Sequence, residues 1–308
     1  MSILPYILLG LLAGAFFPIQ ATINARLRTY AKTPLTASFI AFSVGSIILF
    51  IALLIFDMKF YQRIDFSYPI SIFLGGAASG LIFNVANIVL FAKIGATITT
   101  LVTITGQMIM GTLLDHFGIL NLPIHEVSIL RLLGVILMII AIIIYQNANK
   151  TTQNIDTTKN QYAKYWIALG LFVGVFPPLQ AAFNGQLRLA THSILTSTFL
   201  SFFIGAIMLA ILVLIVEKRI KIPTHTHEGQ KIPFWVYTGG IFGIVIVGGT
   251  IIVIPHLGAV LTSIVFILGQ LLMAVFVDHF GLFGLAKRRV TLQKIFALLL
   301  MFTALAIV

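Results

Sequence analysis

Matching polar side chains stand inside long apolar runs, where they could hydrogen-bond a small solute. Gln20, Asn24 and Arg28 follow one another at intervals of four residues, which places them on one face of a helix. The same spacing recurs at Gln180, Asn184 and Arg188. Polar groups inside a membrane are costly unless they face protein or water. We therefore expect each stripe to line a solute cavity or to bond neighbouring helices; at the membrane ends, the two arginines fit interfacial anchors better than ligands.

Further amides lie in other apolar runs. Gln107 and Gln270 occupy matching places, whereas Asn84 and Asn87 share one helix face without amide counterparts. The residues at the corresponding later positions are Val247 and Thr250. Because the two halves differ at these positions, a cavity between them can bind an asymmetric solute in a single orientation. The predicted substrate-binding residues are Gln20, Asn24, Asn84, Asn87, Gln107, Gln180, Asn184 and Gln270.

Two prolines interrupt the runs that carry the polar stripes. Pro18 and Pro178 lack an N–H, so the carbonyls of Gly14 and Gly174 lose their helical partners. The resulting kink is either a hinge or a static bend, which is common in membrane helices. These four residues are the hinge candidates.

Two Asp-His pairs end apolar runs. Asp115-His116 and Asp278-His279 could pass protons or act in gating, because a carboxylate lies beside an imidazole. The alternative is a helix-end pair at the membrane surface before a Phe-Gly turn. Adjacent residues do not converge on one ion, and the chain has no cysteine, so we expect neither a metal site nor a cofactor.

The elements that hold these residues must be membrane helices. Hydrophobic residues make up 59% of the 308 residues and charged residues 9%, and the mean hydropathy is +1.09. A span needs about 20 apolar residues, and we expect the first run to be such a span and not a cleaved signal peptide, since no basic residue precedes Arg26. The sequence predicts ten spans, at 4–26, 35–56, 69–92, 96–115, 128–146, 164–187, 193–216, 233–254, 259–278 and 289–308.

The charge distribution predicts an orientation. The net charge is +11, but the basic residues flank apolar runs, so we expect no nucleic acid partner. Fifteen Lys and Arg residues fall on the side opposite the N-terminus and four on the N-terminal side. The positive-inside rule then places both termini in the periplasm and the long polar loops in the cytoplasm.

The chain repeats itself. Residues 9–28 and 169–188 are identical at eleven of twenty positions, and residues 106–118 and 269–281 at seven of thirteen. Each half carries five spans, and because five is odd the halves must lie in opposite orientations. Such repeats are typical of secondary transporters with a site near the midplane. We predict a first repeat at 1–147, a polar cytoplasmic linker at 148–162 and a second repeat at 163–308.

The 5+5 arrangement, the G-x-x-x-[GA]…P-x-Q-x-x-x-N opening of each half and the G-Q…D-H-F-G segment resemble the drug/metabolite transporter superfamily, specifically its YdcZ-like branch. The resemblance covers the chain as two fused five-helix units. It implies ten helices around a central cavity and transport of small organic solutes. Small multidrug-resistance relatives use a carboxylate deep in the first helix, and this chain has no equivalent there.

The prediction is a secondary transporter that moves a small polar or zwitterionic metabolite across the bacterial inner membrane, as an exporter or exchanger. Its expected partners are that solute and the lipid bilayer, and the chain is expected to be a monomer or homodimer. A lipid or lipid-precursor flippase is the alternative, since the same architecture can open sideways to lipid. An enzyme is not expected, because the two Asp-His pairs would lie on opposite sides of the membrane. A nucleotide-driven pump is not expected either, because this chain has no G-x-x-x-x-G-K-[ST] phosphate-binding loop.

Overall fold

The computed structural model is helical in nearly all of the chain that it describes. It describes residues 3–121, 124, 129–152, 163–226, 229–284, 287 and 290–307. Within these ranges the only strand-like pairing is an isolated bridge between His225 and Lys231. The predicted all-α class is confirmed.

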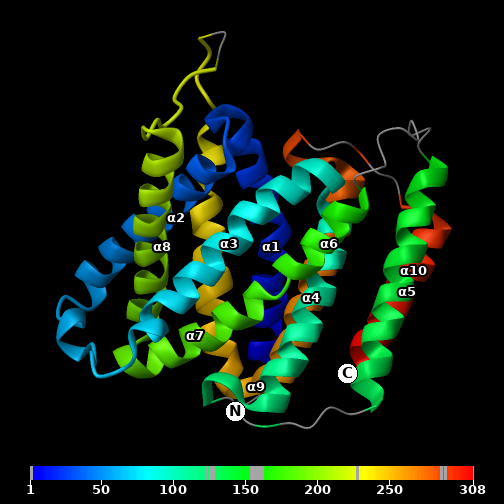
Figure 1. The fold of residues 1–308 in the computed structure, drawn as a ribbon, viewed down its shortest axis with the longest axis horizontal. Helices are drawn as coiled ribbons and strands as arrows, with labels where there is room; N and C mark the ends of the chain where they lie inside the picture. Colours follow the sequence, from blue (N-terminus) through cyan, green and yellow to red (C-terminus); the bar gives the residue numbers. More distant parts are fainter. Residues whose placement is uncertain are drawn as a thin grey trace.

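Ten α-helices and four short 3-10 helices make up the described chain (Figure 1). In the first half these are α1 (Leu4–Ala31), α2 (Pro34–Phe56), η1 (Phe60–Arg63), α3 (Ile70–Ile94), α4 (Ala96–Phe117), η2 (Ile119–Asn121) and α5 (Ile129–Thr152). In the second they are α6 (Ala163–Val173), α7 (Phe176–Thr191), α8 (Ile194–Glu217), η4 (Phe234–Tyr237), α9 (Gly239–Phe280), η5 (Leu282–Gly284) and α10 (Leu292–Ile307). Because α5 runs to Thr152, part of the predicted linker is helical, and residues 153–162 lie outside the described ranges.

The helices supply the ten predicted spans. Seven described stretches are long and apolar enough to cross a membrane, and three shorter apolar ones overlap the remaining predicted spans. The shorter ones are Leu132–Ala141, Ile264–Phe280 and Leu292–Ala304. Large apolar side chains such as Ile55, Phe56 and Leu299 stay exposed, as lipid-facing residues do.

Local sequence sets where the second span of each half begins. Thr33 accepts a hydrogen bond from the Thr36 backbone N–H, and Ser193 does the same for Thr196. Each hydroxyl satisfies one free N–H of the first helical turn. These caps are repeat counterparts, so the same signal starts α2 and α8.

The sixth span is broken where the first is continuous. Pro18 lies inside the unbroken helix α1, whereas α6 ends at Val173 and α7 begins at Phe176. The second half has two consecutive prolines, Pro177 and Pro178, which remove two successive helical hydrogen bonds. The extra proline explains the break.

Helix α9 contains both the eighth and the ninth predicted spans. Asn24 lies against Gly239 at the start of α9, and Ala21, in the same helix α1, packs in one cluster with Val277 near its end. A straight helix would separate positions 239 and 277 by roughly 57 Å. Helix α9 therefore doubles back, and its two arms run along α1 in opposite directions. In the first half the equivalent reversal is made at Gly95, whose φ of 82° suits glycine.

Reciprocal contacts show that the two halves are related by a two-fold rotation. A Cβ added to Gly45 would meet Phe202, and one added to Gly205 would meet Phe42, which is the same contact with the halves exchanged. The rings of Phe42 and Phe202 also face each other at 5.2 Å between centroids. Figure 1 shows α2 beside α8 at one end of the molecule and α5 beside α10 at the other. This arrangement confirms the predicted inverted repeat.

Glycines let the halves cross closely. A Cβ on Gly14 would lie 2.1 Å from the carbonyl oxygen of Phe266, and one on Gly174 would lie 2.2 Å from that of Thr103. Membrane helices associate through such small residues because lipid offers no hydrophobic drive for packing. The first span of each half therefore packs directly against the backbone of the other half.

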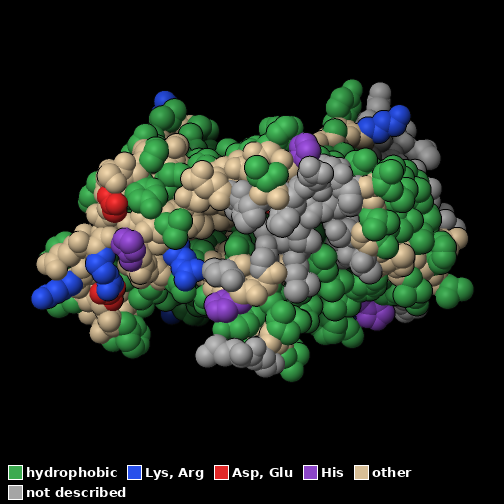
Figure 2. All heavy atoms as spheres, turned by 90° about the horizontal axis from the view of Figure 1, so that it is seen from below, with side chains coloured by type: hydrophobic (Ala, Val, Ile, Leu, Met, Phe, Trp, Pro, Cys, Tyr) green, Lys and Arg blue, Asp and Glu red, His purple; other side chains and the backbone are tan. Residues whose placement is uncertain are grey.

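The face at which α1 begins, called the N-terminal face below, is seen in Figure 2. Hydrophobic side chains cover much of it, and its visible acidic side chains gather toward one end. The described loop between α2 and α3 holds an ion pair of Arg63 with Asp57. The loop that follows α8 lies at the opposite face (Figure 1).

Candidate functional site

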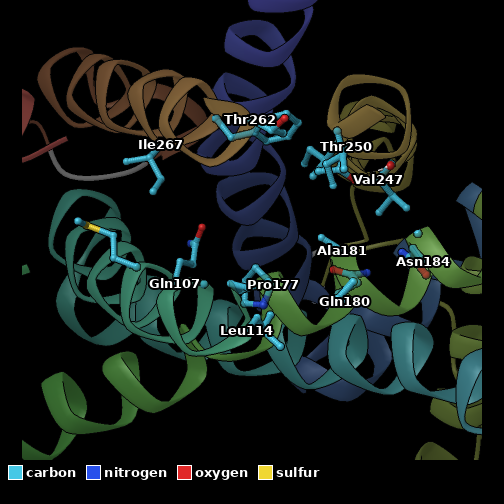
Figure 3. Close-up of a pocket in the computed structure, with 18 of the residues that line it drawn as sticks. Gln107, Leu114, Pro177, Gln180, Ala181, Asn184, Val247, Thr250, Thr262 and Ile267 are labelled. Atoms are coloured by element: carbon cyan, nitrogen blue, oxygen red, sulfur yellow. Dashed lines mark hydrogen bonds between the residues drawn. The ribbon is translucent and has the colours of Figure 1, made fainter. Parts of the chain in front are cut away.

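A cavity of about 190 Å³ lies between the two halves (Figure 3). Its walls come from α4, α7 and both arms of α9, and Phe17 of α1 also lines it. It extends from Gln107, in the middle of α4, to Asp115, near the end of that helix. Since α4 ends at the N-terminal face, the cavity extends from mid-membrane toward that face.

Most of the cavity wall is apolar. Side chains such as Phe17, Leu114 and Phe266 supply hydrocarbon surface. The polar groups on the wall are almost all uncharged, and they are Gln107, Thr112, Gln180, Asn184, Gln186, Thr250, Thr262 and Gln270. Asp115 is the only described lining residue with a charge-bearing side chain, and it has an interaction of its own. The cavity therefore suits an uncharged solute surface better than an exposed ion.

Two glutamines mark the mid-membrane end of the cavity. Nε2 of Gln107 lies 3.4 Å from Oε1 of Gln270, and Nε2 of Gln270 lies 3.5 Å from Oε1 of Gln107. These residues are repeat counterparts, so the two-fold axis passes between them. The pair joins the halves at the inner end of the cavity.

A smaller cavity of about 40 Å³ adjoins the first. Four predicted binding residues line it, namely Gln20, Asn84, Asn87 and Gln180. It shares Phe17, Gln180, Ile246 and Val247 with the larger cavity. This amide-containing space has room for an ordered water, which needs roughly 10–15 Å³.

The structure separates the two matching asparagines. Asn24 donates a hydrogen bond from Nδ2 to Oδ1 of Asn84 at 3.1 Å, is fully buried and lines neither cavity. Asn184 lines the larger cavity, is 1% exposed, and neither of its amide atoms has a hydrogen-bond partner. The position equivalent to Asn84 is Val247, which cannot form the bond.

The other predicted site residues take distinct places. Pro178 lines the larger cavity, Pro18 does not, and Gly14 and Gly174 lie at the crossings between halves. The sequence pattern showed the hinge candidates but did not show that both glycines touch the opposite half. The G-x-x-x-G spacing of Gly10 with Gly14 and of Gly170 with Gly174 was the available signal.

The two Asp-His pairs divide between interior and surface. Asp115 and Asp278 are buried, whereas His116 and His279 are exposed and pack edge-on against the next phenylalanine. Lys294 in α10 is also buried, at 2% exposure, although its sequence position suggested an orienting charge at the membrane surface. All three buried groups are engaged in interactions.

The end of the helix bundle at the opposite face is closed, whereas the end at the N-terminal face holds the cavity. Toward the opposite face, an apolar group packs together that we call the closed cluster: Ala21, Ala25, Phe91 and Val277. Their repeat counterparts all line the larger cavity, and we call them the open wall: Ala181, Gly185, Ile254 and Leu114. These small and apolar residues carry no chemical signal, and only the repeat offset could have singled them out.

A family model matches both halves of the chain, over residues 5–144 and 165–307, and its description is "Putative inner membrane exporter, YdcZ". No curated protein matches the chain.

Proposed function

The chain belongs to the YdcZ family of the drug/metabolite transporter superfamily, and from that premise we propose that it is a secondary transporter that exports or exchanges a small polar metabolite by alternating access. The family supports a multi-pass protein of the inner membrane and a transporter in preference to an enzyme. The proposal adds the mechanism, the binding residues and the orientation.

The contrast between open wall and closed cluster carries the proposal. Equivalent residues of the two halves are apart on one side of the membrane and packed together on the other. Halves of similar sequence can exchange conformations at little net cost, because each arrangement is already formed by one of them. The exchange would close the cavity at the N-terminal face and open it at the opposite face.

The proposed pivot is the set of close crossings around Gly14 and Gly174, with the Gln107–Gln270 pair on the axis. The break between α6 and α7 beside Pro177 gives the second half a place to bend. In the first half, the same bend would fall at Pro18, where the helix is continuous. Gly14, Pro18, Gly174 and Pro178 are therefore kept as proposed hinge residues.

The proposed binding region consists of the two cavities and their amides. Seven of the eight predicted binding residues line one or both cavities. The eighth, Asn24, supports the region through its hydrogen bond to Asn84. Asp115 at the N-terminal end and Asp278 at the other are proposed gating groups, each followed by an exposed histidine. By the positive-inside rule, the N-terminal face is proposed to be periplasmic, so this state faces outward.

Transport by purified protein tests the proposal. Proteoliposomes loaded with a mixture of uncharged and zwitterionic metabolites are diluted, and the solutes that leave are identified by mass spectrometry against empty liposomes. We expect loss of one or a few solutes that saturates with concentration. Protein that scrambles fluorescent phospholipids between leaflets and releases no solute would contradict the proposal in favour of a flippase.

A further inference from the structure

Asn184 stands out as a buried amide whose hydrogen-bonding capacity is unused. It is 1% exposed, it lines the larger cavity, and both Nδ2 and Oδ1 lack partners. Buried amides are rarely left this way, because they lose their hydrogen bonds to water without replacement. Figure 3 shows its side chain at the cavity edge, about one turn of α7 beyond Gln180.

The repeat shows which amide atom is available. A Cβ on Gly239 would lie 2.0 Å from Oδ1 of Asn24, and a Cβ on Gly76 would lie 2.2 Å from Oδ1 of Asn184. Both oxygens therefore rest against a glycine of the other half, which leaves each Nδ2 pointing elsewhere. In the first half that Nδ2 donates to Asn84. In the second half the place of Asn84 is taken by Val247, which lines the cavity and whose side chain cannot accept a hydrogen bond.

The rest of the wall restricts the charge of the molecule that could accept this bond. No described Lys or Arg lines the larger cavity, and Asp115 is already engaged. A carboxylate or ammonium would lose its hydration there without gaining a counter-charge. An uncharged oxygen, such as a carbonyl, loses less and gains the Asn184 donor.

The volume of the larger cavity and its apolar wall indicate the size and polarity of the rest of the solute. The cavity of about 190 Å³ is somewhat larger than an engineered 150 Å³ protein cavity that binds benzene. It fits a body of about the size of a substituted benzene ring. Phe17, Phe266 and Ile246 offer hydrocarbon contacts to that body.

We propose that Asn184 orients the solute, and that the solute is a small uncharged amphipathic molecule whose carbonyl-type oxygen accepts a hydrogen bond from Nδ2 while its apolar body fills the larger cavity. This rests on the proposed transport function and narrows its substrate from polar or zwitterionic to uncharged amphipathic. Asn24, held by Asn84, has a supporting and not a ligand-binding place in this state.

Three probes of one size test the charge and the acceptor: benzamide, benzoate and benzylammonium. Each is added to purified protein in detergent, and the rise in unfolding temperature with concentration gives an apparent affinity. We expect benzamide to stabilise the wild-type protein at concentrations at least tenfold below those needed for either charged probe. A wild-type protein that benzamide does not stabilise, or that binds a charged probe equally well, overturns the proposal.

Two substitutions test the residue. Asn184→Leu removes the donor, and Val247→Asn supplies Asn184 with the partner that Asn24 already has. Both substitutions should lower the apparent affinity for benzamide at least tenfold. Val247→Asn should do so in a protein whose stability without ligand equals or exceeds that of the wild type. The control is Thr303→Val, which removes an exposed hydroxyl bonded to Leu299 on α10 and should leave benzamide binding unchanged. Unchanged benzamide binding in either cavity variant overturns the assignment.

The proposed transport function is tested separately by the substitutions Gly185→Cys and Ala25→Cys, because the accessibility of each introduced thiol from the two faces can be measured without a ligand. If that accessibility alternates while benzamide binding ignores Asn184, the substrate class is wrong and the transport mechanism stands. If benzamide binding depends on Asn184 while accessibility does not alternate, the binding site stands and alternating access fails.

Discussion

Gln107 and Gln270 face each other across the two-fold axis, and each amide nitrogen lies 3.4–3.5 Å from the other's oxygen. Contact between repeat counterparts is possible only on the axis, so this pair and the Phe42–Phe202 pair define its line. The larger cavity reaches the first pair and the smaller cavity reaches the second. Both cavities, which form the proposed solute region, therefore lie along the axis between these two pairs.

Replacing one glutamine of the axis pair should cost more than replacing both. Gln107→Leu leaves Gln270, which is 3% exposed, without its amide partner, and an unsatisfied buried polar group costs about 1–3 kcal/mol. In the double variant Gln107→Leu/Gln270→Leu no amide is left unpaired. Unfolding of the wild type, Gln107→Leu, Gln270→Leu and the double variant in one detergent gives the coupling energy. Additive losses would show that the pair does not interact in the folded protein.

The crossing glycines should tolerate no side chain. Gly174→Ala would place a Cβ 2.2 Å from the Thr103 carbonyl oxygen, so the two halves must separate. We expect a loss of stability of about 1–3 kcal/mol from overpacking. Gly248→Ala is the matched control, because its Cβ would meet only Thr198 at an ordinary 3.9 Å. Equal unfolding temperatures for the two variants would contradict the close crossing.

Glu217 should help to keep the opposite face closed. At the end of α8 it accepts hydrogen bonds from Thr33 at 2.6 Å and Thr36 at 2.7 Å, at the first turn of α2. Its repeat counterpart, Asp57, pairs instead with Arg63, and the Thr196 hydroxyl at the equivalent helix start has no partner. The contact is thus made at the closed face and absent at the open one.

We therefore expect Glu217→Ala to raise the reactivity of a cysteine at position 25 from the opposite face. Removing a carboxylate that accepts two hydroxyl hydrogen bonds at a helix N-terminus costs about 1–2 kcal/mol, enough to shift a two-state equilibrium several-fold. Lys59→Ala, in the loop at the other face, serves as the control. A reactivity unchanged by Glu217→Ala would show that this contact does not hold the closed state.

The sequence predicted the spans well because hydropathy over about 20 residues is set by the bilayer itself. It separated the eighth and ninth spans at Pro255 and Gly258 but missed that α9 stays helical through this turn, since proline and glycine usually end a helix. It placed Asn24 and Asn184 together as ligands because their spacing is the same. Their different environments depend on residue 84 or 247, which lies on another helix of the same half, a tertiary relationship that the stripe alone does not encode.

The difference between open wall and closed cluster was beyond prediction for a physical reason. Gly185 and Ala25 occupy equivalent places in similar sequences, and in the proposed mechanism each half adopts either packing in turn. On that proposal, which side is open is a property of the conformational state, because one sequence encodes both states.

The proposed mechanism requires the open wall and the closed cluster to become accessible in turn, and the reactivity of introduced cysteines measures this. The chain has no cysteine, and a side chain at position 185 meets nothing within 4 Å, so Gly185→Cys and Ala25→Cys can be introduced cleanly. A membrane-impermeant maleimide is applied from each side of oriented vesicles. We predict that position 185 reacts only from the N-terminal face, that position 25 reacts only from the opposite face, and that a bulky adduct at 185 suppresses reaction at 25 in the double variant. Independent reaction of both cysteines, or reaction of one of them from both faces, would contradict alternating access.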